Sequence, residues 1–554
     1  MGAGTEYGQD RLVTPVELLA RTGGSGVRVA LIRPPVDILV KSMSMLGPMP
    51  PIGIAYVAAA ARAVGHDVQV IDAAGEALDQ LEEYESCVGT MRRIGMSVEE
   101  TVASIRPGTE VIGLTHMFMH EWPAVKDIAE QVKARFPEAL VVAGGENATS
   151  FWPWMFEQTD AIDCCVLGEG ERTFTALLNC LAEGTSFADL PGIALRAGVS
   201  GDPTSTGLPV RMRKLGEIPR PAWDLFPMER YLKERSFLGV DRGPSMPMLA
   251  SRGCPYKCTF CSSPQMWTTR YNVRDPEDLA DEIAFYVDTY GITNIDFVDL
   301  TAVTKRQWTL DFCDALEARN LDLTWQLPIG TRSEGIDDVV LKRLSESGCT
   351  NITFAPESGS PRMLEIFDKR LDLDHILEDI RHAHKLGMVI HVNTIIGHPA
   401  ENWHDRWLNL KFLVKAAVAG ADTGSAIMFH PYPGSQDFDQ LYEAGKIEVD
   451  ETLYYDGLAR GAPAHHSWNE GISSRNLYLC QVVMMLSFFA LSNLLHPRRF
   501  LHLIRAVFGN GSEENFSEQA LRTKLHGPMS AKRNGSAAPG GGVDVREPVD
   551  ADVA

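Results

Sequence analysis

Strand-like apolar segments alternate with helical segments in two long series, and this alternation restricts the fold more than any other feature of the chain. The first series runs from about residue 27 to 181 and includes "VRVALIRPP", "EVIGLTH", "ALVVAGGE" and "DCCVLGEGE" as strands. Strands that alternate with helices predict a parallel, doubly wound sheet that binds its ligand at the carboxyl ends of the strands. We therefore expect an α/β, Rossmann-like domain over residues 27–199.

The second series covers residues 247–435 and begins with "PSMPMLASRG". Five further strand-like segments follow: "ITNIDFVDL", "LTWQLPIG", "NITFAPESG", "VIHVNTIIGHP" and "GSAIMFHPYP". Six such units predict a full or partial (β/α) barrel, with functional residues at the strand ends and in the loops that follow them.

The rest of the chain connects or extends these two units. The segment "IPRPAWDLFPMERYL" carries three prolines and predicts a connector between them. The polar, Gly/Pro-rich end of the chain predicts disorder. The remaining expected regions are an N-terminal extension (1–26), the linker (200–246), a mainly helical C-terminal region (436–528) and the disordered tail (529–554).

Composition excludes several classes of protein. A length of 554 residues predicts two or three domains. The net charge of −22 argues against a nucleic-acid partner, because phosphate binding needs a basic surface. The polar start "MGAGTEYGQDRLVTP" does not resemble a secretion signal, and ten scattered cysteines favour a reducing, cytoplasmic location.

The stretch "SRGCPYKCTFCSSP", residues 251–264, breaks that scatter by placing Cys254, Cys258 and Cys261 within eight positions. Thiolates bind soft metals, and a C-x3-C-x2-C loop can hold three corners of an iron–sulfur cubane. Structural zinc normally needs four ligands, and no second C-x2-C pair accompanies this loop. A chance group of buried cysteines is the other alternative. Three protein ligands leave one iron free for a substrate or cosubstrate.

This loop resembles the cluster loop of the radical S-adenosylmethionine (SAM) enzymes. The resemblance implies a (β/α)6 partial barrel and a [4Fe–4S] cluster whose open iron binds SAM. Reductive cleavage of SAM would then give a 5′-deoxyadenosyl radical that abstracts hydrogen. The resemblance also implies that Phe260 packs near the adenine of SAM.

Other SAM contacts are implied by motifs in the same series. "APESGSP" places Glu357, Ser358 and Gly359 at the end of the fourth strand, where a carboxylate resembles the ribose-binding group. "TIIGHPAEN" resembles the fifth-strand motif beside the adenine and supplies Gly397 with Glu401. For the SAM amine, "FVDLTAV" offers Asp299. A capped strand end is the alternative interpretation of the carboxylate in "APESGSP".

The first series resembles the cobalamin-binding domain that precedes the barrel in one large radical SAM subfamily. The resemblance rests on "PPIGIAYVAAAARAVGHDVQVIDA", "VVAGGENAT" and "VLGEGERTF". No D-x-H-x-x-G is present, so no motif histidine is expected below the cobalt, and Asn147 stands where relatives often carry histidine. The glycines of these loops, Gly170 among them, would let a macrocycle approach the backbone, or they simply form tight turns. The residues implied to contact cobalamin are Thr115, Gly144, Gly145, Glu146, Gly168 and Glu169.

The run "NLYLCQVVMMLSFFALSNLLHPRRFLHLIRAVF" raises the question of a membrane segment. Gln481, Ser487, Ser492 and Asn493 interrupt it, so we expect a long helix packed on the barrel and no transmembrane segment. As an alternative, the basic residues at its end could face lipid headgroups or an anionic substrate. These residues are His496, Arg498, Arg499 and Arg505.

The resemblance favours a cobalamin-dependent methyltransferase that moves the SAM methyl group, through methylcobalamin, to an sp3 carbon or a phosphinate phosphorus. It implies a small biosynthetic intermediate as substrate, as in natural-product and antibiotic pathways, and an external electron donor of the flavodoxin or ferredoxin type. A radical cyclase or rearrangement enzyme is the runner-up, and a cobalamin or redox sensor comes third. Five residues near the barrel strand ends could bind an anionic substrate or be structural. They are His391, His398, His404, His430 and Arg332.

Overall fold

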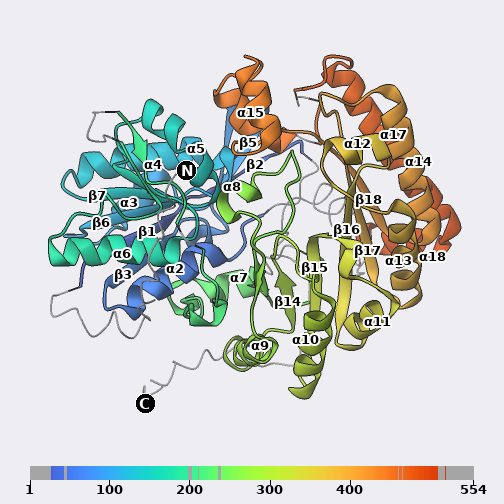
Figure 1. The fold of residues 1–554 in the computed structure, drawn as a ribbon, viewed down its shortest axis with the longest axis horizontal. Helices are drawn as coiled ribbons and strands as arrows, with labels where there is room; N and C mark the ends of the chain where they lie inside the picture. Colours follow the sequence, from blue (N-terminus) through green and yellow to red (C-terminus); the bar gives the residue numbers. More distant parts are fainter. Residues whose placement is uncertain are drawn as a thin grey trace, which may run out of the picture.

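A computed structural model describes residues 26–42, 47–196, 202–209, 211–234, 239–459, 461–463, 466–508 and 518. Two α/β domains lie side by side, and the last two helices, α17 (Ser474–Leu495) and α18 (Pro497–Phe508), cover the outer side of the second one (Figure 1). Apart from Gly26, the expected N-terminal extension and the expected tail lie outside the described residues.

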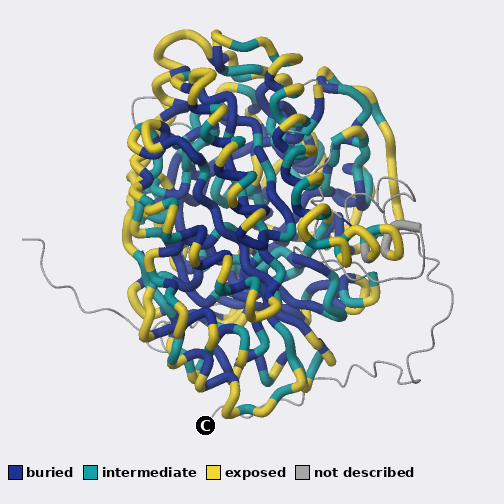
Figure 2. Tube along the Cα trace, turned by 90° about the vertical axis from the view of Figure 1, so that its right-hand side faces the viewer, coloured by how far each residue is buried: buried dark blue, intermediate teal, exposed yellow. Residues whose placement is uncertain are grey.

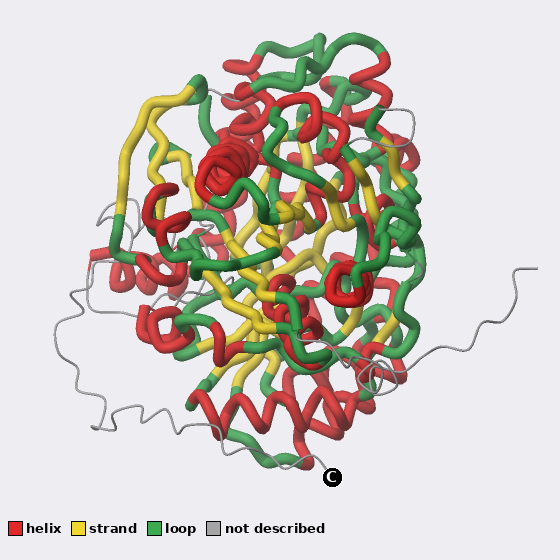
Figure 3. Tube along the Cα trace, turned by 90° about the vertical axis from the view of Figure 1, so that its left-hand side faces the viewer, coloured by secondary structure: helices red, strands yellow, loops and turns green. Residues whose placement is uncertain are grey.

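The first domain is built on a seven-stranded sheet of order β10-β9-β8-β7-β6-β1-β3. Five of its strands, from β8 to the edge strand β3, are parallel, as predicted, with helices on both faces of the sheet (Figure 3). The strands are β1 (Arg28–Arg33), β3 (Asp67–Asp72), β6 (Val111–Thr115), β7 (Leu140–Gly144), β8 (Cys164–Val166), β9 (Ile193–Leu195) and β10 (Thr204–Ser205). The helices are α2 (Ile52–Ala63), α3 (Val98–Ala103), α4 (Trp122–Arg135), α5 (Glu146–Gln158) and α6 (Gly170–Glu183).

Two features of the first domain differ from the simple doubly wound pattern. Strands β9 and β10 extend the sheet with antiparallel pairing. A separate antiparallel sheet of order β2-β5-β4 is formed by β2 (Val36–Leu39), β4 (Leu81–Ser86) and β5 (Gly89–Ile94). The small sheet packs Leu39 and Met91 against Tyr455 of the C-terminal region, so it links distant parts of the chain.

The second domain is an open barrel of six parallel strands in sequential order, which confirms the prediction. The strands are β11 (Ser245–Met248), β14 (Asn294–Phe297), β15 (Thr324–Thr331), β16 (Cys349–Glu357), β17 (Val389–Ile396) and β18 (Thr423–Met428). The helices between them are α9 (Pro276–Tyr290), α10 (Arg306–Ala318), α11 (Asp338–Glu346), α12 (Pro361–Ile366), α13 (Leu373–Lys385) and α14 (Trp403–Ala419). Near the cysteine loop lie β12 (Ser251–Arg252), β13 (Asn272–Val273) and the short helix α8 (Ser263–Trp267).

The connector joins the two cores instead of separating them. Its short helix α7 (Met228–Glu234) carries Tyr231, whose hydroxyl accepts a hydrogen bond from Arg33 (2.6 Å) and donates to Asp72 (2.6 Å). Trp223 donates from Nε1 to the hydroxyl of Tyr286 in the barrel (3.1 Å). One continuous hydrophobic core therefore runs from the first domain through the connector into the barrel.

The C-terminal region is helical, as expected, and consists of α15 (Gln436–Glu443), α16 (Glu451–Asp456), α17 (Ser474–Leu495) and α18 (Pro497–Phe508). Helix α17 packs on the barrel through buried Leu477, Met484 and Phe488. Helix α17 is also long and apolar enough to cross a membrane by length and composition alone, with a mean hydropathy of 1.7. The polar residues that interrupt it are too few to bring the mean hydropathy below that of a membrane-spanning helix. Short 3₁₀ turns occur at Gly75–Ala77, Met119–Glu121, Leu215–Glu217, Trp223–Leu225, Ser333–Gly335 and Gly457–Ala459.

Candidate functional site

The cysteine loop lies between β12 and α8, beyond the carboxyl end of β11. Cys254, Cys258 and Cys261 are free thiols of intermediate exposure. Burial is the main cause that raises the pKa of each thiol, and the charge of one neighbouring cysteine adds to it in every case. The three sulfur atoms therefore belong to one local group.

Two cations face this group and favour negative charge there. Arg332, which follows β15, points Nη1 at Cys258 Sγ (3.9 Å), and its guanidinium lies over the Tyr256 ring, 3.4 Å from the centroid. Lys369 lowers the pKa of Cys258, against the dominant effect of burial. Both cations would offset the negative charge of thiolates bound to a metal cluster.

The three thiols are the type of donor that an iron–sulfur cubane takes. Among the described residues, no group of three or more His, Cys, Asp or Glu side chains is arranged to hold one metal ion. In a cubane, each thiolate binds a different iron atom, so the three sulfur atoms need not converge on one point.

Glu357 ends β16 in a left-handed conformation, with φ of +66°. Its carboxylate pairs with the buried Lys369 (2.8 Å), the same ammonium that acts on Cys258. A non-glycine residue rarely adopts this conformation unless its surroundings hold it there. Ser358, which follows, is buried and accepts a hydrogen bond from the Ser360 amide (3.1 Å), so its hydroxyl serves the turn.

The fifth-strand motif forms a tight turn. Gly397 has φ of +83° and donates its amide to the Glu401 carboxylate (2.7 Å). A Cβ at this glycine would lie 2.5 Å from Leu477 of α17, so a side chain has no room. Burial raises the pKa of Glu401 to about 7, against the opposing effect of Arg406. Helix α17 thus packs directly against the predicted SAM motif.

Asp299, the residue expected to hold the SAM amine, supports the base of the cysteine loop. Its carboxylate accepts the backbone amides of Ala250 (3.1 Å) and Ser251 and the Ser251 hydroxyl. Burial raises the pKa of Asp299 to about 6. Its carboxylate is occupied by these donors in the structure, and its SAM contact stays a prediction.

Phe260 begins a row of rings beside the cysteine loop. Its ring meets Phe367 edge-on at 5.1 Å, Phe367 meets His398 at 5.2 Å, and His398 meets Phe429 at 4.8 Å. Thr259 accepts the Asp437 amide (3.0 Å), which fastens the loop to α15. The adenine contact of Phe260 stays a prediction.

In the first domain, the predicted cobalamin loops gather at the carboxyl ends of β6, β7 and β8. Thr115 pairs with Gly144 across β6 and β7. Gly145 has φ of +118°, and a Cβ there would lie 2.7 Å from the His116 carbonyl oxygen. Gly168 has φ of +69° and lies against Pro209 of the connector. Both glycines therefore serve turns and close packing; the glycines' cobalamin contacts remain predictions.

The sequence reasoning did not single out His116 as part of this edge. It is fully buried against Trp122 and Phe151, and its Nε2 lies 3.0 Å from Asn147 Nδ2. Burial lowers its pKa to about 3, so the ring is neutral. In the described part of the chain, the Ser150 hydroxyl of α5 is buried without a hydrogen-bond partner. An unsatisfied buried hydroxyl fits a polar ligand, such as a cofactor with many amide groups.

The two sets of loops meet at Glu146. Its carboxylate accepts a hydrogen bond from Ser262, directly after Cys261 (3.1 Å). Helix α5, which begins at Glu146, packs against α8. The cysteine loop is thus attached to the first domain at its C-terminal end.

A buried ion network attaches the other end, two residues before Cys254. Arg252 pairs with Glu171 (2.6 Å) and Glu169 (3.3 Å), and Arg211 of the connector pairs with Glu169 (2.8 Å). All four side chains are at most 7% exposed. Glu169 therefore joins the domains in the structure, and its predicted cofactor contact stays untested.

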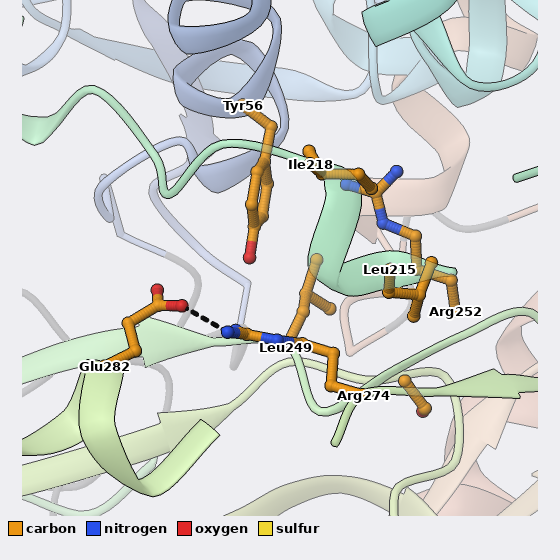
Figure 4. Close-up of a pocket in the computed structure, with 8 residues that line it drawn as sticks. Tyr56, Leu215, Ile218, Leu249, Arg252, Arg274 and Glu282 are labelled. Carbon is orange, nitrogen blue, oxygen red and sulfur yellow. Dashed lines mark ion pairs between the residues drawn. The ribbon is translucent and has the colours of Figure 1, made fainter. Parts of the chain in front are cut away.

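Figure 4 shows the space beside this network at the domain boundary. Tyr56 of α2 points toward the ion pair of Arg274 and Glu282 (2.6 Å), and Arg252 stacks on the Tyr56 ring at 4.9 Å. The cavity between them measures about 10 Å³, which is room for roughly one water molecule. The boundary is tightly closed here.

The candidate anion-binding histidines are mostly held by protein partners. His398 lies 3.2 Å from Asp437 and His430 lies 3.1 Å from Asp456. His391 Nε2 lies within hydrogen-bond distance of Asn393 Oδ1 (2.6 Å), and burial lowers the pKa of His391 to about 4. His404 is exposed at the start of α14. Their role in substrate binding stays a prediction.

The fold and site define an enzyme class that joins a cobalamin domain to a cluster-bearing barrel, and comparisons with known proteins agree. Residues 248–413 match the radical SAM superfamily, and residues 42–178 match the B12 binding domain. The chain therefore belongs to the cobalamin-dependent radical SAM enzymes, whose cofactors are a [4Fe–4S] cluster, SAM and cobalamin.

Relatives of two kinds resemble this chain. Cytidylyl-2-hydroxyethylphosphonate methyltransferase of Streptomyces wedmorensis is 27% identical over 73% of this chain and 80% of its own length. Anaerobic magnesium-protoporphyrin IX monomethyl ester cyclase of Rubrivivax gelatinosus is 26% identical over 73% of this chain and 68% of its own. The structure of the methyltransferase TsrM from Kitasatospora setae shares the fold, with a TM-score of 0.62 and 15% identity over 90% of this chain and 99% of that one.

Proposed function

We propose that this protein is a radical SAM methyltransferase that transfers a methyl group, by way of cobalamin, to a non-nucleophilic sp3 carbon or phosphinate phosphorus. Its substrate is a small intermediate of a natural-product or antibiotic pathway. One observation carries the proposal: the cysteine loop is fastened at both ends to loops of the cobalamin domain, by Arg252 to Glu169 and Glu171 and by Ser262 to Glu146. This arrangement suits chemistry that uses both cofactors in one reaction.

The chain's own residues have separable tasks in this proposal. The three loop cysteines bind the cluster, and Arg332 and Lys369 offset its negative charge. Asp299 fixes the base of the loop through Ala250 and Ser251. When bound, the cluster and SAM supply the radical that removes a substrate hydrogen, while cobalamin carries the methyl group.

An external electron donor of the flavodoxin or ferredoxin type and a cytoplasmic location complete the proposal. All ten cysteines are free thiols, which suits a reducing compartment.

Isotope labelling tests the proposal before the substrate is known. The reconstituted protein is supplied with SAM bearing a deuterated methyl group, hydroxocobalamin and a strong reductant, and mass spectrometry should detect deuteromethylcobalamin. A methyltransferase must reload cobalamin from SAM in every turnover, whereas a cyclase has no such need. Cys313→Ala, in α10 and outside the cysteine loop, should behave like wild type in this assay.

A radical cyclase is the second candidate, favoured by the similarity to the Rubrivivax gelatinosus cyclase. With the right acceptor, a methyltransferase forms 5′-deoxyadenosine and S-adenosylhomocysteine in equal amounts. Sustained turnover that yields deoxyadenosine without S-adenosylhomocysteine would support the cyclase and contradict the methyltransferase.

A further inference from the structure

Three helices lie on the outer side of the barrel, away from the cobalamin domain: α14, α17 and α18 (Figure 1). We call their solvent-facing surface the outer helical face; Figure 2 views this side of the molecule and shows exposed stretches along it. Eleven of the seventeen exposed large hydrophobic side chains found among the described residues belong to these helices. They are Trp403, Trp407, Val418, Leu479, Val483, Leu486, Leu494, Leu495, Phe500, Leu501 and Ile504.

Helix α17 is apolar on both sides. One side is buried on the barrel through Leu477, Met484 and Phe488. The opposite side exposes Val483 (53%) and Leu486 (64%). A helix packed on the surface of a globular domain normally turns polar residues to water, and contiguous apolar patches mark interaction sites.

Charge indicates what covers this face. No Asp or Glu occurs between residues 471 and 508, although the whole chain carries a net charge of −22. Arg475, Arg498 and Arg505 are exposed in this segment, and α14 exposes Lys411 and Lys415. The outer helical face is therefore apolar and basic on an acidic protein, which is complementary to an anionic, partly apolar surface.

We infer that the outer helical face docks on an anionic phospholipid membrane, with the helices lying in the plane of the interface. Tryptophan side chains favour the depth of the lipid headgroups, and Trp403 (73% exposed) and Trp407 (55% exposed) are available for this position. The basic side chains can reach lipid phosphates. A spanning arrangement is disfavoured because Gln481 donates to the Ala426 carbonyl of β18 (2.7 Å) and Arg499 pairs with Asp422 (2.7 Å).

Vesicle binding of the full-length protein tests the inference. Sedimentation is measured with vesicles of phosphatidylcholine alone and of phosphatidylcholine with phosphatidylglycerol. Binding should require the anionic lipid, weaken at high salt, and shift the tryptophan emission to shorter wavelength. No binding, or equal binding to both vesicle types, would overturn the inference.

Surface variants connect binding to this face. Lys411→Glu with Lys415→Glu should weaken binding by at least about twentyfold, because each basic residue near an anionic membrane contributes about fivefold. Leu486→Glu should also abolish binding, since it places a charge in the apolar interface. Val339→Glu, at a residue 51% exposed on α11, is the matched control and should bind like wild type.

A second copy of the chain is the competing occupant. Light scattering over a range of concentrations detects it. A dimer that Leu486→Glu disrupts, or vesicle binding unchanged in both surface variants, would contradict membrane docking. The readout is independent of methyl transfer, so failure here leaves the proposed function standing.

Discussion

Replacing Arg252 with methionine tests whether the ion network holds the cysteine loop on the cobalamin domain. Arg252 is buried and contacts Glu171 at 2.6 Å and Glu169 at 3.3 Å. After the substitution, Arg211 still pairs with Glu169 (2.8 Å), but Glu171 loses its partner in the network while remaining buried. Breaking one side of a buried ion pair destabilises a protein by about 3–5 kcal/mol.

This destabilisation can be measured as a faster rate of amide hydrogen exchange, followed by mass spectrometry. If local opening requires the network to break, a loss of about 3 kcal/mol speeds exchange about a hundredfold in the peptide covering residues 250–262. The barrel strands far from the boundary should exchange as in wild type. Cobalamin and cluster contents are measured on the same samples.

Two further variants distinguish the loss of the buried ion pair from a general loss of stability. Arg319→Met breaks an ion pair with Glu277 and Asp281, both largely exposed carboxylates, and should cost less than about 1 kcal/mol. The double variant of Arg252→Met and Glu171→Met should recover much of the loss, because an apolar pair of similar volume replaces the ion pair. Exchange in Arg252→Met within threefold of wild type, or purely additive effects in the double variant, would refute the reasoning.

Further predictions concern the cofactors and pH. Alanine at each loop cysteine should abolish the cluster absorbance and 5′-deoxyadenosine formation, and a variant that keeps both would overturn the cluster assignment; the positions are Cys254, Cys258 and Cys261. Alanine at Cys313 or Cys349, both buried in the barrel domain, should leave the cluster content unchanged. The full-length protein should bind cobalamin with its lower base displaced, and a base-on or histidine-ligated optical spectrum would contradict this. Burial raises the pKa of Glu401 from 4.5 to about 7, so its contribution to stability is present below about pH 4.5 and is lost as pH rises toward 7. Glu401→Gln should flatten that dependence by at most about 3 kcal/mol in denaturant titrations, and an unchanged pH profile would contradict the assignment.

The sequence predicted the features that depend on local pattern. Strand and helix periodicity predicted the parallel sheet and the six barrel strands, and the cysteine loop follows the first barrel strand as the sequence predicted. The small sheet β2-β5-β4 was not predicted, because the sequence of β4, "LEEYES", shows no pattern of a buried face. The exposed apolar side of α17 was also not predicted, because hydropathy does not distinguish a buried apolar face from an exposed one.

Side-chain pairing between distant segments could not be predicted from pattern. Glu169 stands in a loop that the family resemblance assigns to cobalamin, yet its carboxylate is taken by Arg211, 42 residues later, and Arg252, 83 residues later. Nothing local marks those arginines as its partners. Burying four charges at a domain boundary is costly unless their geometry is well matched, so the network tolerates few relative orientations of the two domains. These ion pairs, which the sequence pattern does not predict, therefore fix how the cysteine loop faces the predicted cobalamin loops.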